Sequence, residues 1–196
     1  MSFVSIIANS NFITIMSDGR VTNSKTREVE GEDVQKFVLF NNKTSFIAFT
    51  GNRGFAEHIL VNADTASNDY DKWVHSIKVI LHDPELQQLR NDHVESYLQM
   101  AFGGINQRNV LELFTYNSNK NEIIKEYIPP DNDQVIFLGN NKLFEKAYDL
   151  FLGETKQKAH IAPSDFISTQ RIINIFVADN DPSVNKNTFR AVIKRH

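Results

Sequence analysis

Short apolar runs alternate with polar segments along the chain, and their spacing predicts the secondary structure. Residues 3–8 and 12–16 form two apolar runs around the turn-forming residues 9–11, which predicts a β-hairpin. The apolar runs 36–40 and 44–50 predict a second hairpin. All four predicted strands are apolar on both faces, which indicates a sheet that is covered on both sides.

Beyond Gly51 the apolar positions recur at the three- and four-residue spacing of helices. This spacing predicts helices over 56–63 and 73–81. It predicts a third from Pro84 to about Ile105, with Gly103-Gly104 as its C-terminal cap. The remaining predictions are strands over 110–116, 123–128 and 135–138, helices over 142–152 and 163–178, and a last strand over 188–194.

Predicted strands and helices fall into separate blocks, which indicates an α+β fold rather than a doubly wound parallel sheet. Two helix blocks and strands apolar on both faces suit two stacked antiparallel sheets with helices outside, a four-layer αββα sandwich. The sequence contains no internal repeat, low-complexity tract or linker. Residues 1–196 are therefore predicted to form a single domain.

The composition and net charge of the chain exclude several classes of function. The 196 residues are 41% apolar and 23% charged, as in ordinary globular domains, and the net charge of −3 provides no basic excess for nucleic acid. The absence of cysteine excludes disulfides, thiolate metal sites and thiol nucleophiles. The apolar runs are too short to span a membrane, and no secretory signal is visible, so we expect a cytoplasmic protein.

Histidines are candidate metal ligands, but their spacing in this sequence does not suit a metal site. His75 and His82 lie seven residues apart on a predicted helix, and His93 and His160 have no evident partners. Metal sites need convergent ligands, commonly at short spacing. We therefore expect surface histidines and predict no metal site.

The first hairpin brings together two groups with chemical potential. If its turn centres on Ser10, Ser2 lies directly across from Asp18, and a hydroxyl and a carboxylate share one corner of the sheet. A slip of one residue would send these side chains to opposite faces. The alternative that Asp18-Gly19 is only a turn after a strand stays open.

The first 51 residues contain four features at defined positions: Ser2, Asp18-Gly19, Lys36 at the head of a predicted strand, and the run 46–51 ending in Gly51. In this pattern the sequence resembles a proteasome β subunit and, more broadly, the N-terminal nucleophile hydrolases. The order of predicted elements agrees with that family over almost the whole chain. The resemblance implies the αββα sandwich of threonine-type endopeptidases. Taken singly, Lys36 also suits a surface lysine, and Gly51 a helix start.

The resemblance also implies a mechanism. Ser2 would be the nucleophile after removal of Met1, and its α-amine the general base. Lys36 would lower the pKa of that amine by like-charge repulsion, and Asp18 would hold Lys36. The backbone N–H of Gly51 would stabilise the oxyanion. These roles describe a hydrolase that cleaves an amide bond in a peptide or small amide without a metal or cofactor.

Further roles follow from the same resemblance. Phe49 and Arg53 flank Gly51 and would line the pocket for the residue before the scissile bond. Asn140 stands where the family usually has a supporting serine. Asp181 and Ser183 would correspond to the family's last supporting pair.

The alternative is a catalytically inactive ring or scaffold subunit of the same fold. Met1 ahead of Ser2 and Asn140 in place of serine favour it. Proteasome-like subunits stack into rings, so the resemblance implies a homo-oligomer. We expect the helix over 142–152 to contribute to the contact, because its apolar residues spread beyond one core-facing stripe. They are Leu143, Phe144, Tyr148, Phe151 and Leu152.

Overall fold

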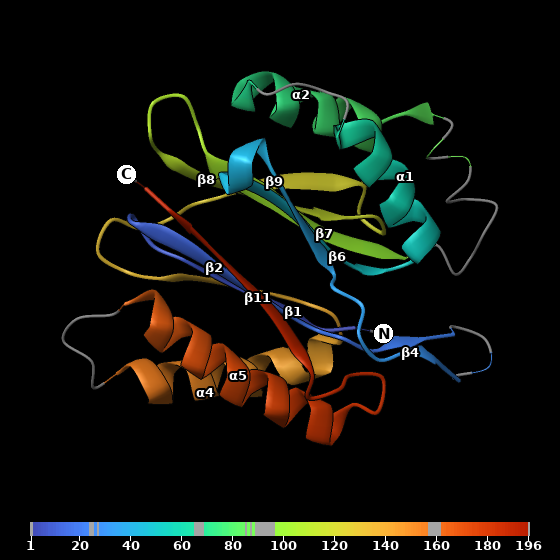
Figure 1. Cartoon of the computed structure of the whole chain (residues 1–196), viewed down its shortest axis with the longest axis vertical. Helices are drawn as coiled ribbons and strands as arrows, with labels where there is room; N and C mark the ends of the chain where they lie inside the picture. The colour runs from blue at the N-terminus through green and yellow to red at the C-terminus, as the bar shows by residue number, and fades with distance from the viewer. Residues whose placement is uncertain are drawn as a thin grey trace.

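Two β-sheets lie face to face, and a pair of helices covers the outer face of each (Figure 1). The computed structural model describes residues 2–195 except 24, 25, 27, 65–68, 85, 87, 89–96 and 157–161. Within this described part, the arrangement confirms the predicted α+β class and the four-layer αββα sandwich.

The first sheet has four strands in the order β10-β1-β2-β11, and all neighbours are antiparallel. Every residue of β1 and β2 is buried, because one face packs on the other sheet and the opposite face on helices. The strands are β1 (Val4–Ala8), β2 (Phe12–Asp18), β10 (Gln134–Leu138) and β11 (Thr188–Lys194).

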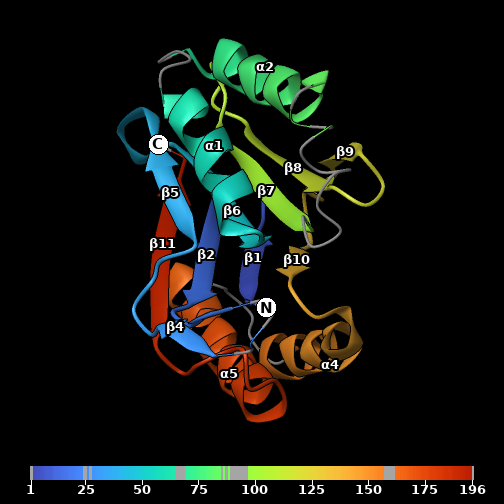
Figure 2. The ribbon, with the colours of Figure 1, turned by 90° about the vertical axis from the view of Figure 1, so that its right-hand side faces the viewer.

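The second sheet has five antiparallel strands in sequence order, β5-β6-β7-β8-β9. They are β5 (Phe37–Phe40), β6 (Ser45–Gly51), β7 (Leu98–Ile105), β8 (Leu111–Asn117) and β9 (Glu122–Glu126). A separate short hairpin joins β3 (Val21–Thr22) to β4 (Val29–Gly31). Figure 2 shows β4 at the same end of the sandwich as the start of β1.

The helices α1 (Arg53–Asp64) and α2 (Tyr70–Leu81) pack on the second sheet. The first sheet is covered by α4 (Phe144–Thr155) and α5 (Pro163–Asn180). Two 3-10 turns, η1 (Asn41–Lys43) and η2 (Asn141–Leu143), precede β6 and α4. None of the described helices is long and apolar enough to cross a membrane.

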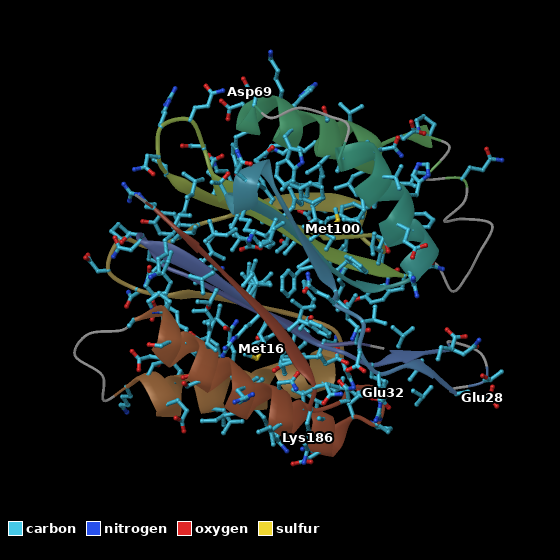
Figure 3. All side chains as sticks on the ribbon, in the orientation of Figure 1. Met16, Glu28, Glu32, Asp69, Met100 and Lys186 are labelled. Atoms are coloured by element: carbon cyan, nitrogen blue, oxygen red, sulfur yellow. The ribbon has the colours of Figure 1, made fainter. Side chains whose placement is uncertain are left out.

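Three apolar layers hold the sandwich together. The central one lies between the sheets and includes Ile15 and Phe46. Met100 belongs to the layer between the second sheet and its helices, whereas Met16 points from β2 toward α4 and α5 (Figure 3). Alternate residues of one strand thus serve different layers, as the two-residue period of strands requires.

The register of the first hairpin differs by one residue from the prediction. Ala8 pairs with Ile13 and Val4 with Ser17, so Phe3, not Ser2, lies across from Asp18. The loop contains two residues, because the N–H of Asn9 already donates to the carbonyl of Phe12 at 3.0 Å. Centring the turn on Ser10 assumed one loop residue too many.

The prediction of a helix from Pro84 to Ile105 is wrong at its C-terminal part, where β7 runs from Leu98 to Ile105. β7 is hydrogen-bonded to β6 on one side and to β8 on the other, and this pairing overrides the helical spacing of the sequence. Gly103 and Gly104 are strand residues rather than a helix cap. A Cβ on either would overlap a backbone carbonyl, of Glu112 or Thr44 respectively.

Candidate active site

A buried ion pair joins the two sheets at one end of the sandwich. Asp18 is the last residue of β2, and Lys36 immediately precedes β5. Lys36 Nζ lies 2.6 Å from Asp18 Oδ1 and 3.0 Å from the Asp18 carbonyl oxygen. Both side chains are almost completely buried, at 4% and 0% exposure for Lys36 and Asp18. The pair therefore fixes the end of one sheet against the start of a strand in the other.

Backbone donors complete the surroundings of the Asp18 carboxylate. Oδ1 accepts the N–H of Phe3 at 2.8 Å, and Oδ2 accepts the N–H of Arg20 at 2.9 Å. Burial lowers the pKa of Lys36 below its ordinary value, while the charge and hydrogen bond of Asp18 act in the opposite direction. The Lys36 side chain is thus held in place by one carboxylate.

A pocket of about 210 Å³ opens above this pair, and Ser2 and Lys36 both contribute to its lining. Gly51, Phe49 and Arg53 line it too. The pocket thus brings together five of the six residues that the sequence proposed for catalysis and substrate binding. Asp18 stands behind the lining, bonded to Lys36 and to the N–H of Phe3, the residue after Ser2.

Gly51 ends β6 rather than opening a helix, since α1 begins two residues later at Arg53. Its φ of +106° lies in the region that favours glycine, and a Cβ there would overlap the carbonyl oxygen of Tyr97. Arg53 is exposed and paired with Glu57 at 2.6 Å. The glycine thus allows a close approach of the chain to Tyr97, and both Gly51 and the paired arginine line the pocket.

Asn140, Asp181 and Ser183 form one hydrogen-bonded cluster. Asp181 Oδ2 accepts from Asn140 Nδ2 at 3.2 Å, and Oδ1 accepts from the hydroxyl of Ser183 at 2.6 Å. Partial burial works against ionisation of Asp181, but hydrogen bonds from Ser183 and Asn140 outweigh it and lower the pKa of the carboxyl. The cluster lies beside Ser2, because Gly139 packs so closely on the Ser2 carbonyl that a Cβ would overlap it.

Asn185 is a site neighbour whose role the sequence did not indicate. Its Oδ1 accepts the N–H of Gly19 at 2.8 Å, and its Nδ2 donates to the Glu32 carbonyl at 2.9 Å and to the Glu32 carboxylate. Figure 3 shows Glu32 and Lys186, the residue after Asn185, at the same end of the molecule. Hydrogen bonds from Asn185 and Arg20 lower the pKa of Glu32. The buried amide thereby holds the segment between Asp18 and Lys36 near both of its ends, at Gly19 and at Glu32.

Among the described residues, no histidine lines this pocket. His75 and His82 are exposed on and just after α2, whereas His93 and His160 lie outside the described residues, as does Met1. In the described part of the chain, no group of three or more histidine, aspartate or glutamate side chains is placed to hold a metal ion.

Several solved structures share this fold, although no model of a protein family and no curated protein matches the sequence. Eukaryotic HslV from Trypanosoma brucei is similar over 98% of this chain and 99% of its own, with a TM-score of 0.69 and 13% identity. Anbu (ancestral beta-subunit) from Yersinia bercovieri is similar over 97% of this chain and 80% of its own, with a TM-score of 0.73 and 14% identity.

An Anbu (Gly-1) mutant from Hyphomicrobium sp. strain MC1 matches 100% of this chain and 82% of its own, with a TM-score of 0.75 and 10% identity. At these identities the likeness concerns the fold, and it covers the whole sandwich rather than one motif. The chain therefore has the proteasome β-subunit type of N-terminal nucleophile hydrolase fold.

Proposed function

We propose that this protein is an N-terminal nucleophile hydrolase that cleaves an amide bond in a peptide or small amide, with Ser2 as nucleophile. The observation that carries the proposal is the buried Lys36–Asp18 pair beneath a pocket that Ser2 and Gly51 also line. A buried ion pair contributes little to the stability of a core, because burying both ions costs desolvation energy. A catalytic site that needs a fixed cation beside its nucleophile explains why the pair is present.

The proposed reaction needs only groups of the chain and one water molecule. After removal of Met1, the free α-amine of Ser2 accepts the proton of its own hydroxyl as Oγ attacks the carbonyl carbon. The N–H of Gly51 stabilises the oxyanion that forms. The intermediate expels the amine product, which takes the proton from the ammonium, and leaves an ester on Ser2. Water then attacks this ester with the same amine as base and releases the acid.

Lys36 and Asp18 set the protonation of that amine. An α-amine has a pKa of about 7.7–8.0 in the absence of neighbours. The Lys36 ammonium, held by Asp18, lowers it by like-charge repulsion and leaves more free base at neutral pH. Asn140 follows Gly139, which packs on the Ser2 carbonyl, and its cluster with Asp181 and Ser183 would hold the amine in a productive orientation.

Turnover of fluorogenic peptide amides, with Met1 removed, tests the proposal. Intact mass establishes what fraction of the protein begins with Ser2, and activity should scale with that fraction. The Ser2→Ala variant should be inactive. The Ser10→Ala variant, which alters a serine at the loop of the same hairpin, should retain activity. Equal turnover by Ser2→Ala and wild type would contradict the proposal.

The second candidate is an inactive scaffold subunit, favoured by Asn140 where the family usually has serine. In either case we propose a homo-oligomer. Tyr148 and Leu152 are 45% and 44% exposed and lie one helical turn apart on α4, which supports a contact through this helix. Phe151, expected from the sequence to share in that contact, is instead buried and packs against Phe166 of α5.

A further inference from the structure

A single glutamine side chain bridges the two sheets behind Ser2. Gln99 lies in β7 of the five-stranded sheet, directly opposite Thr50 of β6. Its Oε1 accepts the N–H of Gly139 at 2.6 Å, and Gly139 directly follows β10 of the four-stranded sheet. The same oxygen accepts the hydroxyl of Thr50 at 3.3 Å. One acceptor therefore serves donors from both sheets.

Each end of this bridge is adjacent to a proposed reacting group. Gly139, with a φ of +134°, packs directly on the carbonyl of Ser2. Thr50 precedes Gly51, the proposed oxyanion donor, and lines the same pocket as Ser2. The nucleophile and the oxyanion donor thus belong to different sheets, and their separation depends on how the sheets are held at this end.

Among the described residues, polar links from both sides of the site hold the sheets here. The Lys36–Asp18 pair ties the end of β2 to the start of β5. The Gln99–Gly139 bond ties β7 to the end of β10. Gln99 does not line the Ser2 pocket but a separate cavity of about 320 Å³, so its side chain is not placed to touch the substrate.

We propose that Gln99 is a positioning residue, whose amide oxygen fixes the spacing between Ser2 and Gly51 for the attack on the substrate carbonyl. The inference rests on the proposed function, because it assigns a role within that reaction. Displacement of a reacting group by about 1 Å can reduce the rate by about 100-fold, so one lost cross-link at this place is expected to reduce catalysis.

The chain contains a matched control. Gln134, at the other end of β10, donates from Nε2 to Glu126 of β9 at 3.1 Å, so it too links the two sheets. Gln134 and Gln99 are both half-buried, and both line the 320 Å³ cavity. The two links differ in place: the link of Gln134 is at the start of β10, whereas the link of Gln99 is just beyond the end of β10, where Gly139 packs on the Ser2 carbonyl.

The experiment measures acylation of the Met1-free protein by a β-lactone, separating the maximal rate from the half-saturating concentration. Gln99→Met should lower the maximal rate at least about tenfold and change the half-saturating concentration little, because positioning acts on the chemical step. Gln134→Met should react at the wild-type rate. Thermal unfolding of both variants identifies any shared loss of stability.

Gln99→Glu is the second variant, since a carboxylate can accept both hydrogen bonds. It should recover most of the maximal rate. Its added charge should raise the pKa of the Ser2 ammonium and shift the rate profile to higher pH. This shift remains measurable if the methionine variant does not fold.

Wild-type acylation by Gln99→Met, or an equal loss in Gln134→Met, would overturn the role of Gln99 while leaving the proposed function intact. The role of Gln99 would also be overturned if Gln99→Glu had an unshifted pH profile and a maximal acylation rate as low as that of Gln99→Met. A wild-type protein that takes no label at Ser2 would overturn the proposed function and the role of Gln99 together.

Discussion

The Asp18 carboxylate accepts hydrogen bonds from Lys36, from the N–H of Phe3 and from the N–H of Arg20. Asp18 could be proposed from the sequence because its spacing from Ser2 matches a known family. Lys36 could be proposed because it heads the next strand and matches the family after an insertion of one residue. The side-chain amides of Gln99 and Asn185, which support the site, could not be proposed from the sequence. Gln99 and Gly139 are 40 residues apart, and Gly19 and Asn185 are 166 apart. Nothing local in a sequence marks an amide that finds its partner at such a distance.

Removing one member of the ion pair should damage both stability and reactivity. Lys36→Met leaves Asp18 charged in a buried site, which should lower the free energy of unfolding by about 3–5 kcal/mol. Urea denaturation measures this change. The double variant Lys36→Met with Asp18→Asn should regain much of the stability and none of the acylation at Ser2. A double variant that reacts like wild type would contradict the role of Lys36.

Asp181 should contribute an acid-sensitive part of the stability. Its folded pKa lies below the ordinary value of 3.8, so its contribution is complete above that pH and is lost as pH falls through the folded pKa. The difference in unfolding free energy between wild type and Asp181→Asn should therefore be constant near neutral pH and shrink below about pH 4. Denaturation at several pH values measures it, and a difference that grows on acidification would contradict this assignment.

At the scale of elements, the sequence pattern predicted one strand to its exact bounds and mistook another for a helix. The last strand was predicted over 188–194 and is β11, Thr188–Lys194. The pattern failed in β7, where Leu98 and Ala101 fit a helical spacing as well as a strand buried on both faces. Strands buried on both faces lose the alternation that distinguishes them from buried helices, so only their partners decide.

The loop between α5 and β11 should stabilise the end of β2 through Asn185. Asn185→Ala leaves the N–H of Gly19 without its acceptor in a buried position, which should reduce the free energy of unfolding by about 1–3 kcal/mol. Acylation of Ser2 should slow as well. Asn187→Ala is the control, because Asn187 is exposed and bonds Asp33 at 3.3 Å on the surface. Equal effects of the two substitutions would argue against a specific clamp at Gly19.

At the scale of the whole molecule, the stacked sheets place Ser2, the candidate nucleophile, next to one sheet and Gly51, the candidate oxyanion donor, in the other. The fold itself was predictable, because apolar faces on both sides of the strands leave few arrangements other than a covered sandwich. The relative placement of the sheets was not predictable, since it depends on side chains that meet across the central layer.

The exposed apolar side chains of α4 should form a contact between copies of the chain. Light scattering should give a multiple of 22.5 kDa at micromolar concentration. Tyr148→Asp with Leu152→Asp should reduce that mass while the protein stays folded, because both side chains face solvent. Val61→Asp with Val79→Asp, on exposed positions of α1 and α2, is the control. A monomeric wild type would contradict the assembly.

The central claim is that Ser2, once freed from Met1, is a nucleophile, and its direct test is the site of acylation by a β-lactone. Peptide mapping by mass spectrometry after a short reaction should locate the adduct on Ser2. The adduct should be absent from Ser2→Ala and from protein that retains Met1, and it should form slowly in Lys36→Met. Unmodified Ser2 in fully Met1-free protein, or an adduct spread over other hydroxyls at equal rates, would contradict the account.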